Sequence, residues 1–143
     1  MKIRAVVIDD EKRSRDTLSG LIAKYCFEDV EVVAEADGCV SGIEAIKTHA
    51  PEVVFLDIQM PDGSGFKLLE ELDEINFEVV FTTAYDQFAI KAIRYSALDY
   101  LLKPIVPAEL RNSVDKVKQK KNTGTINRHI KVLLENIKET GSS

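Results

Sequence analysis

Short apolar runs alternate along the chain with longer segments in which apolar residues recur at helical spacing. The runs are rich in Val, Ile and Phe, and the middle ones are apolar at consecutive positions. Such runs are typical of parallel strands that helices cover on both faces. The predicted strands are Arg4–Asp9, Val30–Ala36, Val53–Ile58, Glu78–Thr83 and Tyr100–Leu102.

A helical segment follows each predicted strand, with apolar residues at the i, i+3, i+4 and i+7 positions of one face. Helix-starting signals support this pattern, because Ser64 can cap a helix and Pro107 suits a first helical position. The helices are predicted at Glu11–Tyr25, before Pro51, from Ser64 to Ile75, after Asp86 and from Pro107 onward. Five βα units in a row predict an α/β fold, a doubly wound five-stranded parallel sheet of the flavodoxin-like class.

The residues after the fifth helix predict an appendage. Lys118–Thr125 is polar and contains Gly124, which is typical of a linker. One more amphipathic stripe then follows, made of Ile126, Ile130, Leu133, Leu134 and Ile137. We therefore predict a domain over residues 1–121, followed by a linker and amphipathic helix over residues 122–143. The stripe must be buried on this body, on a second copy or on another domain.

The composition is that of an ordinary globular protein, with 45% hydrophobic and 30% charged residues in a chain of 143. Cys26 and Cys39 have no metal-ligand spacing, so we interpret them as buried thiols in a reducing compartment. The first residues form no signal peptide, and no apolar stretch approaches the roughly 20 residues of a membrane span. We expect a cytoplasmic protein without a membrane partner.

The charge is distributed unevenly along the chain. Residues 1–106 carry 11 Lys and Arg against 20 Asp and Glu, whereas residues 107–143 carry 8 against 4. An acidic body disfavours direct binding to DNA and suits a site that collects a divalent cation. The basic tail is interpreted as a solvated helix face.

Five polar residues fall at the carboxyl ends of the predicted strands, where open parallel sheets bind their ligands. They are Asp9, Asp10, Asp57, Thr83 and Lys103. Three carboxylates repel one another unless a cation lies among them, and a site of oxygen ligands without His or Cys favours Mg²⁺ or Mn²⁺. The rim therefore predicts a metal site.

The same residues suit phosphoryl transfer, which depends on positioning and on neutralisation of charge. Asp57 is the predicted nucleophile, because a carboxylate can attack phosphorus. Lys103 could reach one phosphoryl oxygen and the Thr83 hydroxyl a second. Asp62, Gly63 and Gly65 are interpreted as turn residues only.

These motifs resemble the response regulator receiver domains of bacterial two-component systems. The pattern consists of Asp9-Asp10, Asp57 with the following MPDGSG, Thr83-Ala84 and Lys103-Pro104, and the resemblance covers Met1 to about Lys121. Residues 81–105, FTTAYDQFAIKAIRYSALDYLLKPI, are similar to regulators of the LytTR type, the LytR/AlgR family. The resemblance implies the (βα)5 receiver fold.

The resemblance implies the following phosphoryl chemistry. Asp57 accepts a phosphoryl group from a phosphohistidine of a sensor histidine kinase or a phosphotransfer protein. Lys103 pairs with the phosphoryl oxygens, and the backbone N–H of Ala84 completes the cradle. The peptide bond before Pro104 is expected to be cis.

It also implies the metal ligands and the switch. Mg²⁺ is held by Asp10, Asp57 and the backbone carbonyl of Gln59, and through water by Asp9. Thr83 moves toward the new phosphoryl charge, and the ring of Tyr100 turns into the space that Thr83 leaves.

The partners implied by the resemblance lie on one face of the domain and beyond its end. Asp86–Ser96, Tyr100–Leu102 and Pro107–Lys121 form the candidate homodimer face. In LytTR-type regulators a DNA-binding output domain follows, and we expect this chain to be a part of such a protein. A stand-alone phosphorelay receiver is the alternative.

Three other functions fit less well. A Mg²⁺-dependent aspartyl-phosphate phosphatase or phosphotransferase would need an acidic residue where Gln59 stands, so we expect no enzyme beyond self-phosphorylation and self-dephosphorylation. A nucleotide-binding module would need a glycine-rich phosphate loop after the first strand, where DDEKRSR stands instead. Direct DNA binding conflicts with the acidic body.

Overall fold

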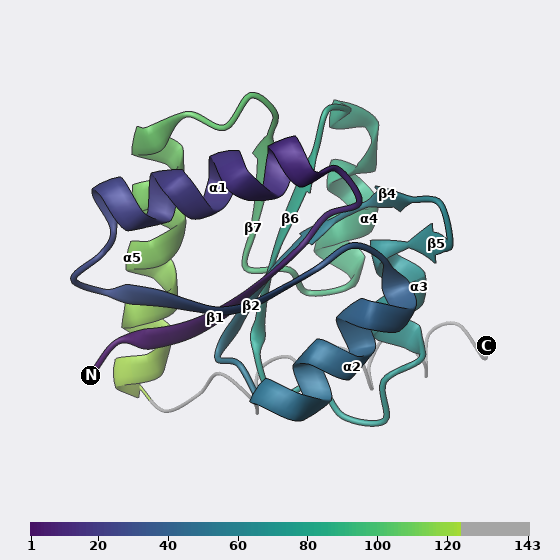
Figure 1. Cartoon of the computed structure of the whole chain (residues 1–143), viewed down its shortest axis with the longest axis horizontal. Coiled ribbons are helices and arrows are strands. Elements are labelled where there is room, and N and C mark those ends of the chain that lie inside the picture. The colour runs from purple at the N-terminus through teal and green to yellow at the C-terminus, as the bar shows by residue number, and fades with distance from the viewer. Residues whose placement is uncertain (124–143) are drawn as a thin grey trace.

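A computed structural model describes residues 1–123 of the chain, and its central feature is one five-stranded parallel sheet (Figure 1). The strands run in the order β2-β1-β3-β6-β7. Their bounds are β1 Ile3–Ile8, β2 Val30–Ala36, β3 Val53–Asp57, β6 Glu78–Thr83 and β7 Asp99–Leu102. This is the flavodoxin-like strand order, and the predicted fold class is confirmed.

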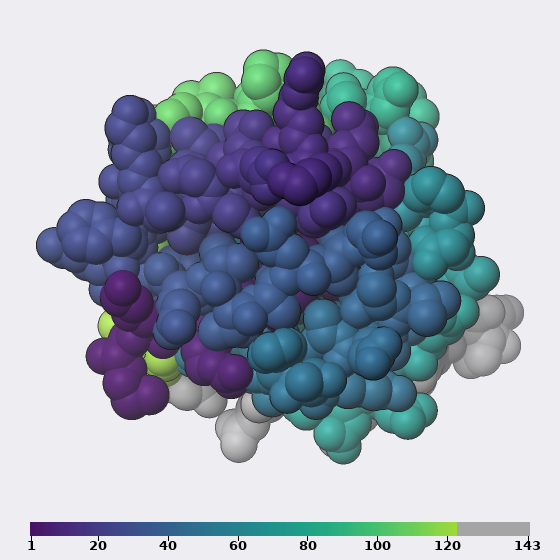
Figure 2. Space-filling model, in the orientation of Figure 1, coloured from purple at the N-terminus to yellow at the C-terminus, as the bar shows by residue number. Residues whose placement is uncertain are grey.

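Helices cover both faces of the sheet. Their bounds are α1 Lys12–Tyr25, α2 Cys39–His49, α3 Gly65–Glu70, α4 Ala89–Arg94 with a preceding 3-10 turn at Asp86–Phe88, and α5 Pro107–Thr123. Side chains of α1 and α5 pack with one face of the strands, and side chains of α2, α3 and α4 pack with the other. Residues of α1, β2 and α2, purple to blue, make up most of the front surface in Figure 2.

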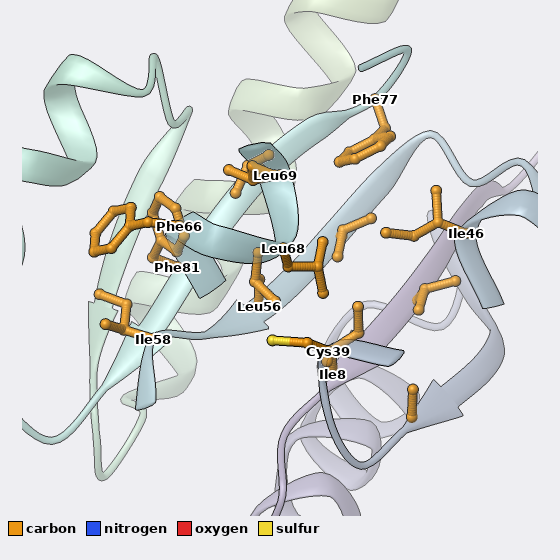
Figure 3. Close-up of a cluster of buried hydrophobic side chains, with 14 of the residues drawn as sticks. Ile8, Cys39, Ile46, Leu56, Ile58, Phe66, Leu68, Leu69, Phe77 and Phe81 are labelled. Carbon is orange, nitrogen blue, oxygen red and sulfur yellow. The ribbon is translucent and has the colours of Figure 1, made fainter. Parts of the chain in front are cut away.

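The two faces of the sheet therefore have separate apolar cores. In the core under α2 and α3, Leu68 of α3 and Leu56 of β3 belong to one buried cluster, and the rings of Phe66 and Phe81 lie 4.7 Å apart (Figure 3). Cys39, the first residue of α2, lies in the same core as a buried free thiol, and Cys26 is buried in the other core. None of the helices within residues 1–123 is long and apolar enough to cross a membrane.

The third helix is shorter than its apolar pattern predicts. Ser64 caps it as expected, since its hydroxyl accepts a hydrogen bond from the Lys67 amide at 3.1 Å. The helix nevertheless ends at Glu70, and Leu72 and Ile75 pack against the core from the connection to β6. Apolar residues in a loop can mimic a helical pattern when the loop is held against the core.

The predicted linker at Lys118–Thr125 is wrong for its first six residues, because α5 continues to Thr123. The lysines near the end of the helix pair with carboxylates of the body, Lys118 with Asp29 at 3.1 Å and Lys121 with Glu52 at 2.7 Å. These ion pairs stabilise the helical conformation of the segment that was predicted to be a linker. Gly124 and the amphipathic stripe from Ile126 to Ile137 lie outside the described residues.

A small antiparallel hairpin follows β3 and was not predicted. Its strands are β4 Gln59–Met60 and β5 Gly63–Ser64, with Gln59 opposite Ser64. Two residues per strand give no periodic signal in a sequence. The hairpin directly follows Asp57, so it begins at the edge of the sheet where the site residues are predicted.

Candidate functional site

The residues predicted to share one edge of the sheet do so. Asp9 and Asp10 follow β1, Asp57 and Thr83 are the last residues of β3 and β6, and Lys103 follows β7. All five strands are parallel, so these ends meet at the carboxyl edge. Lys103 is also held there by its backbone, whose N–H donates to the carbonyl of Thr83 at 2.8 Å.

One ammonium group lies between two buried carboxylates. The Lys103 Nζ donates a hydrogen bond to Asp9 Oδ2 at 2.7 Å and lies 3.5 Å from Asp57 Oδ2. The other oxygen of Asp9 accepts a hydrogen bond from the Glu11 amide at 2.9 Å. The other oxygen of Asp57 accepts one from the Gln59 amide at 3.3 Å. Both carboxylates are thus oriented by the backbone that follows them.

Burial disfavours the charged forms of Asp57 and Lys103 in this cluster. Burial, followed by the neighbouring Asp9 carboxylate, raises the pKa of Asp57 to about 7, and Lys103 only partly opposes this. Burial also acts to lower the pKa of Lys103, but the hydrogen bond to Asp9 and the charge of Asp57 outweigh it and raise that pKa. One lysine therefore does not neutralise the three carboxylates of the rim.

The same carboxylates can hold a cation. Ligand oxygens of Asp9, Asp10 and Asp57 all lie within 4.8 Å of one another, with Asp10 the most exposed of the three. An incompletely neutralised set of hard oxygen donors, without His or Cys, suits Mg²⁺. The donor set therefore fits the metal that the sequence predicts.

The start of α3 lies in close contact with the end of β3 at Gly65. A Cβ atom at Gly65 would lie 2.6 Å from the backbone oxygen of Asp57 and 3.0 Å from Leu56 Cγ, so no larger residue fits without movement. The Gly65 amide also donates to the carbonyl of Ile58 at 2.9 Å. Gly65 was interpreted as a turn residue, but its role is to let α3 begin against the site.

The two residues of the predicted switch lie near each other at the same edge. Thr83 is buried and its hydroxyl accepts a hydrogen bond from the Tyr85 amide at 3.2 Å, while Ala84 between them is exposed. The hydroxyl of Tyr100, which is partly buried, donates to the backbone carbonyl of Tyr85. The backbone of Tyr85 thus contacts both side chains.

Two contributors to the site were missed in the sequence. The guanidinium of Arg15 donates to the backbone carbonyl of Asp9 at 2.8 Å and lies 3.6 Å from Glu35. The carboxylate of Asp62, interpreted only as a turn residue, accepts hydrogen bonds from the amides of Cys39 and Val40 in α2. The Asp62 contacts leave no local signal because they join segments far apart in the chain, and no sequence pattern shows that the Arg15 guanidinium reaches the Asp9 carbonyl six residues earlier.

Comparisons with known proteins agree with this geometry. The model of the response regulator receiver domain family matches residues 5–115. Transcriptional regulatory protein BtsR of Escherichia coli is 40% identical over 121 residues, covering 84% of this chain and 50% of BtsR. Sensory transduction protein LytT of Bacillus cereus is 35% identical over 129 residues, covering 89% of this chain and 52% of LytT. The chain spans about half the length of these curated relatives.

A solved structure is similar over most of the described chain. The REC domain of AraT, a response regulator from Geobacillus stearothermophilus, aligns with a TM-score of 0.75 and 36% identity, covering 87% of this chain and 99% of that domain. The match to LytT also agrees with the LytTR-type resemblance of residues 81–105. On the strength of its fold, its acidic rim and these matches, the chain belongs to the response regulator receiver domain family of two-component systems.

Proposed function

We propose that this receiver accepts a phosphoryl group on Asp57 from the phosphohistidine of a sensor histidine kinase or a phosphotransfer protein, in a Mg²⁺-dependent reaction. The observation that carries the proposal is the position of Asp57. Its carboxylate is buried at the carboxyl edge of the sheet, next to Asp9 and Lys103, where a structural role would not require charge.

In the proposed reaction an oxygen of Asp57 attacks phosphorus and the bond from phosphorus to the histidine nitrogen breaks. The leaving imidazole takes up a proton, and Asp57 becomes an acyl phosphate. Asp10, Asp57 and the backbone carbonyl of Gln59 would hold Mg²⁺, with Asp9 acting through water. Bound Mg²⁺ supplies positive charge that offsets the phosphoryl oxygens and the carboxylates.

The remaining residues of the rim would bind the transferred group. Lys103 is already held between Asp9 and Asp57, so a small movement lets it pair with a phosphoryl oxygen. The Ala84 backbone N–H would donate to a second oxygen and the Thr83 hydroxyl to a third. The cis bond between Lys103 and Pro104, expected from the resemblance, is present.

We propose Thr83 and Tyr100 as the switch. Phosphorylation would draw the Thr83 hydroxyl away from the Tyr85 amide. The ring of Tyr100, whose hydroxyl now bonds the Tyr85 carbonyl, would then turn inward. Both side chains form a hydrogen bond with the backbone of Tyr85, so movement of one would change the surroundings of the other.

The switch would be read on the face of α4, β7 and α5. This face exposes large apolar side chains, namely Ile90 and Ile93 of α4 and Leu102 of β7. Their exposure supports a homodimer that forms through this face when Asp57 is phosphorylated.

We propose that the output is transcriptional and resides in a further domain. The supporting observations are that BtsR is named a transcriptional regulatory protein and that the relatives are about twice as long as this chain. DNA contact would belong to that domain, because residues 1–106 are acidic. The receiver itself would catalyse only its own phosphorylation and dephosphorylation, in the cytoplasm where phosphohistidine donors are found.

The test is phosphorylation by acetyl phosphate with Mg²⁺, followed by intact mass measurement. We expect one added phosphoryl group, lost in alkali, and none without Mg²⁺ or in Asp57→Asn. Asp73→Asn, which makes the same change in the connection between α3 and β6, is the matched control and should be modified like the wild type. Where no modification is trapped, beryllofluoride binding followed by fluorine NMR separates rapid hydrolysis from a failure to bind. No binding of beryllofluoride to the wild type would contradict the proposal.

A further inference from the structure

We propose that Asp62 is a positioning residue that fixes the β4–β5 hairpin to the amino end of α2, and thereby holds the Gln59 backbone carbonyl in place for the metal. This inference rests on the proposed function, because it assigns Gln59 a metal-binding carbonyl. It adds a residue to the site that lies outside the carboxylate cluster and does not touch the reacting atoms.

The contacts of Asp62 join two segments that are far apart in the sequence. Its Oδ1 accepts a hydrogen bond from the Cys39 amide at 2.8 Å, and its Oδ2 accepts one from the Val40 amide at 3.2 Å. These bonds lower the pKa of Asp62, so the side chain is an anion under ordinary conditions. The hairpin turn thus places a charged acceptor on the first two amides of a helix of 11 residues.

Helix α2 depends on this acceptor because its own cap cannot supply one. The N-cap residue is Gly38, which has no side chain, and the first amides of a helix have no partner within the helix. The nearby Ser41 hydroxyl serves a different purpose, since it accepts from the Gly38 and Asp37 amides at 3.1 and 3.2 Å. The cap of α2 is therefore provided by the hairpin that follows the phosphoacceptor.

The absence of a side chain at Gly38 makes room for the Asp62 carboxylate. A Cβ atom there would lie 2.9 Å from both carboxylate oxygens of Asp62, so any other residue would push the carboxylate away. A second link lies beside it, because the thiol of Cys39 donates to the Ser64 carbonyl at 3.4 Å. Cys39 itself is buried in the core (Figure 3), so the hairpin is tied to a fixed part of the protein.

The hairpin needs such ties because it is very short. A two-stranded ribbon of this size is not stable alone, and its position follows from its anchors. Gln59 lies opposite Ser64 within it, and the Gln59 amide donates to Asp57. Loss of the Asp62 contacts would leave Gln59 less fixed. Partners that orient metal ligands commonly change metal affinity by 10- to 100-fold when they are removed.

The experiment compares Mg²⁺ binding by calorimetry in the whole chain and in variants on both sides of the contact. We expect Asp62→Ala and Gly38→Ala each to weaken Mg²⁺ binding by about 10-fold, at a temperature where every variant is folded. Asp62→Asn keeps one acceptor oxygen and should recover part of the affinity. Asp73→Ala removes the same charge away from the hairpin and should bind like the wild type. The double variant Gly38→Ala/Asp62→Ala should be no weaker than Asp62→Ala, because both changes break one contact.

Amide hydrogen exchange provides a readout that does not depend on metal. Exchange of the Cys39 and Val40 amides should accelerate in Asp62→Ala and Gly38→Ala, but not in Asp73→Ala. Wild-type affinity in Asp62→Ala, with Mg²⁺ still bound by the wild type, would overturn this inference and leave the proposed function intact. Failure of the wild type itself to bind Mg²⁺ would overturn both.

Discussion

The ammonium group of Lys103 lies 2.7 Å from a carboxylate oxygen of Asp9, although 94 residues separate the two in the sequence. The Asp9 side chain is almost completely buried, whereas that of Lys103 retains 22% of its exposure. Lys103 therefore compensates a buried negative charge, and in the proposed function the same ammonium group would pair with a phosphoryl oxygen.

Lys103→Ala should lower the free energy of unfolding by about 2–3 kcal/mol, because it leaves buried carboxylates without their cation. Urea denaturation without Mg²⁺ measures this. Lys116→Ala is the control, since Lys116 lies 3.3 Å from Asp99 and is half exposed, and it should cost less than about 1 kcal/mol. Equal losses in the two variants would contradict the buried-pair explanation. Lys103→Ala should also slow phosphorylation, whereas Lys116→Ala should not.

Mg²⁺ should stabilise the wild-type chain. A ligand that binds only the folded state adds about 2.7 kcal/mol at 100 times its dissociation constant. Thermal unfolding with Mg²⁺ and with a chelator measures the difference. We expect it to be lost in Asp10→Asn and retained in Asp16→Asn, since Asp16 pairs with Lys12 on the exposed face of α1. The same stabilisation in Asp10→Asn would place the metal elsewhere.

Alanine should have opposite effects at two glycines. Gly65→Ala places a Cβ atom 2.6 Å from the Asp57 backbone oxygen and should destabilise the fold by about 1–3 kcal/mol while slowing phosphorylation of Asp57. Gly20 lies within α1 with nothing within 4 Å of its Cβ position. Gly20→Ala should therefore stabilise by about 0.5–1 kcal/mol without affecting phosphorylation. Denaturation and intact mass measured on both variants test the pair.

Glu78 should make the protein less stable as the pH rises. Its side chain is buried at the start of β6, and within the described part of the chain its oxygens accept no hydrogen bond, although Lys120 Nζ lies 3.8 Å away. Burial raises the pKa of Glu78, and Lys120 only partly offsets this. The folded state thus holds the proton more tightly than the unfolded state, whose pKa is about 4.5. The stabilisation that protonated Glu78 gives the folded state is complete below the unfolded pKa of about 4.5. It is lost as the pH rises through the higher pKa of the folded state.

The measurement is the free energy of unfolding from pH 4 to pH 8, in wild type and in Glu78→Gln. The wild type should lose stability relative to the variant across this range. Glu31→Gln, at an exposed position of β2, should follow the wild type. Parallel curves for wild type and Glu78→Gln would show that folding does not change the pKa of Glu78, which would contradict this prediction.

The strands, the fold class and the principal residues of the rim could be predicted from the residue pattern alone. Consecutive apolar residues identify buried parallel strands, and a parallel sheet brings their carboxyl ends to one edge. Asp57 at the end of such a strand was therefore recognisable as a candidate site residue without knowledge of its neighbours. The short hairpin, the early end of α3 and the extension of α5 were not recognisable, because contacts with distant residues fix them.

Which polar groups contact one another could be read only from the folded chain. The pairing of Lys103 with Asp9, the burial of Glu78 and the capping of α2 by Asp62 all join segments remote in the chain. Local patterns report the preferences of a segment for helix, strand or turn. They do not report which polar group a folded chain brings within hydrogen-bond distance, because that depends on how the helices pack on the sheet.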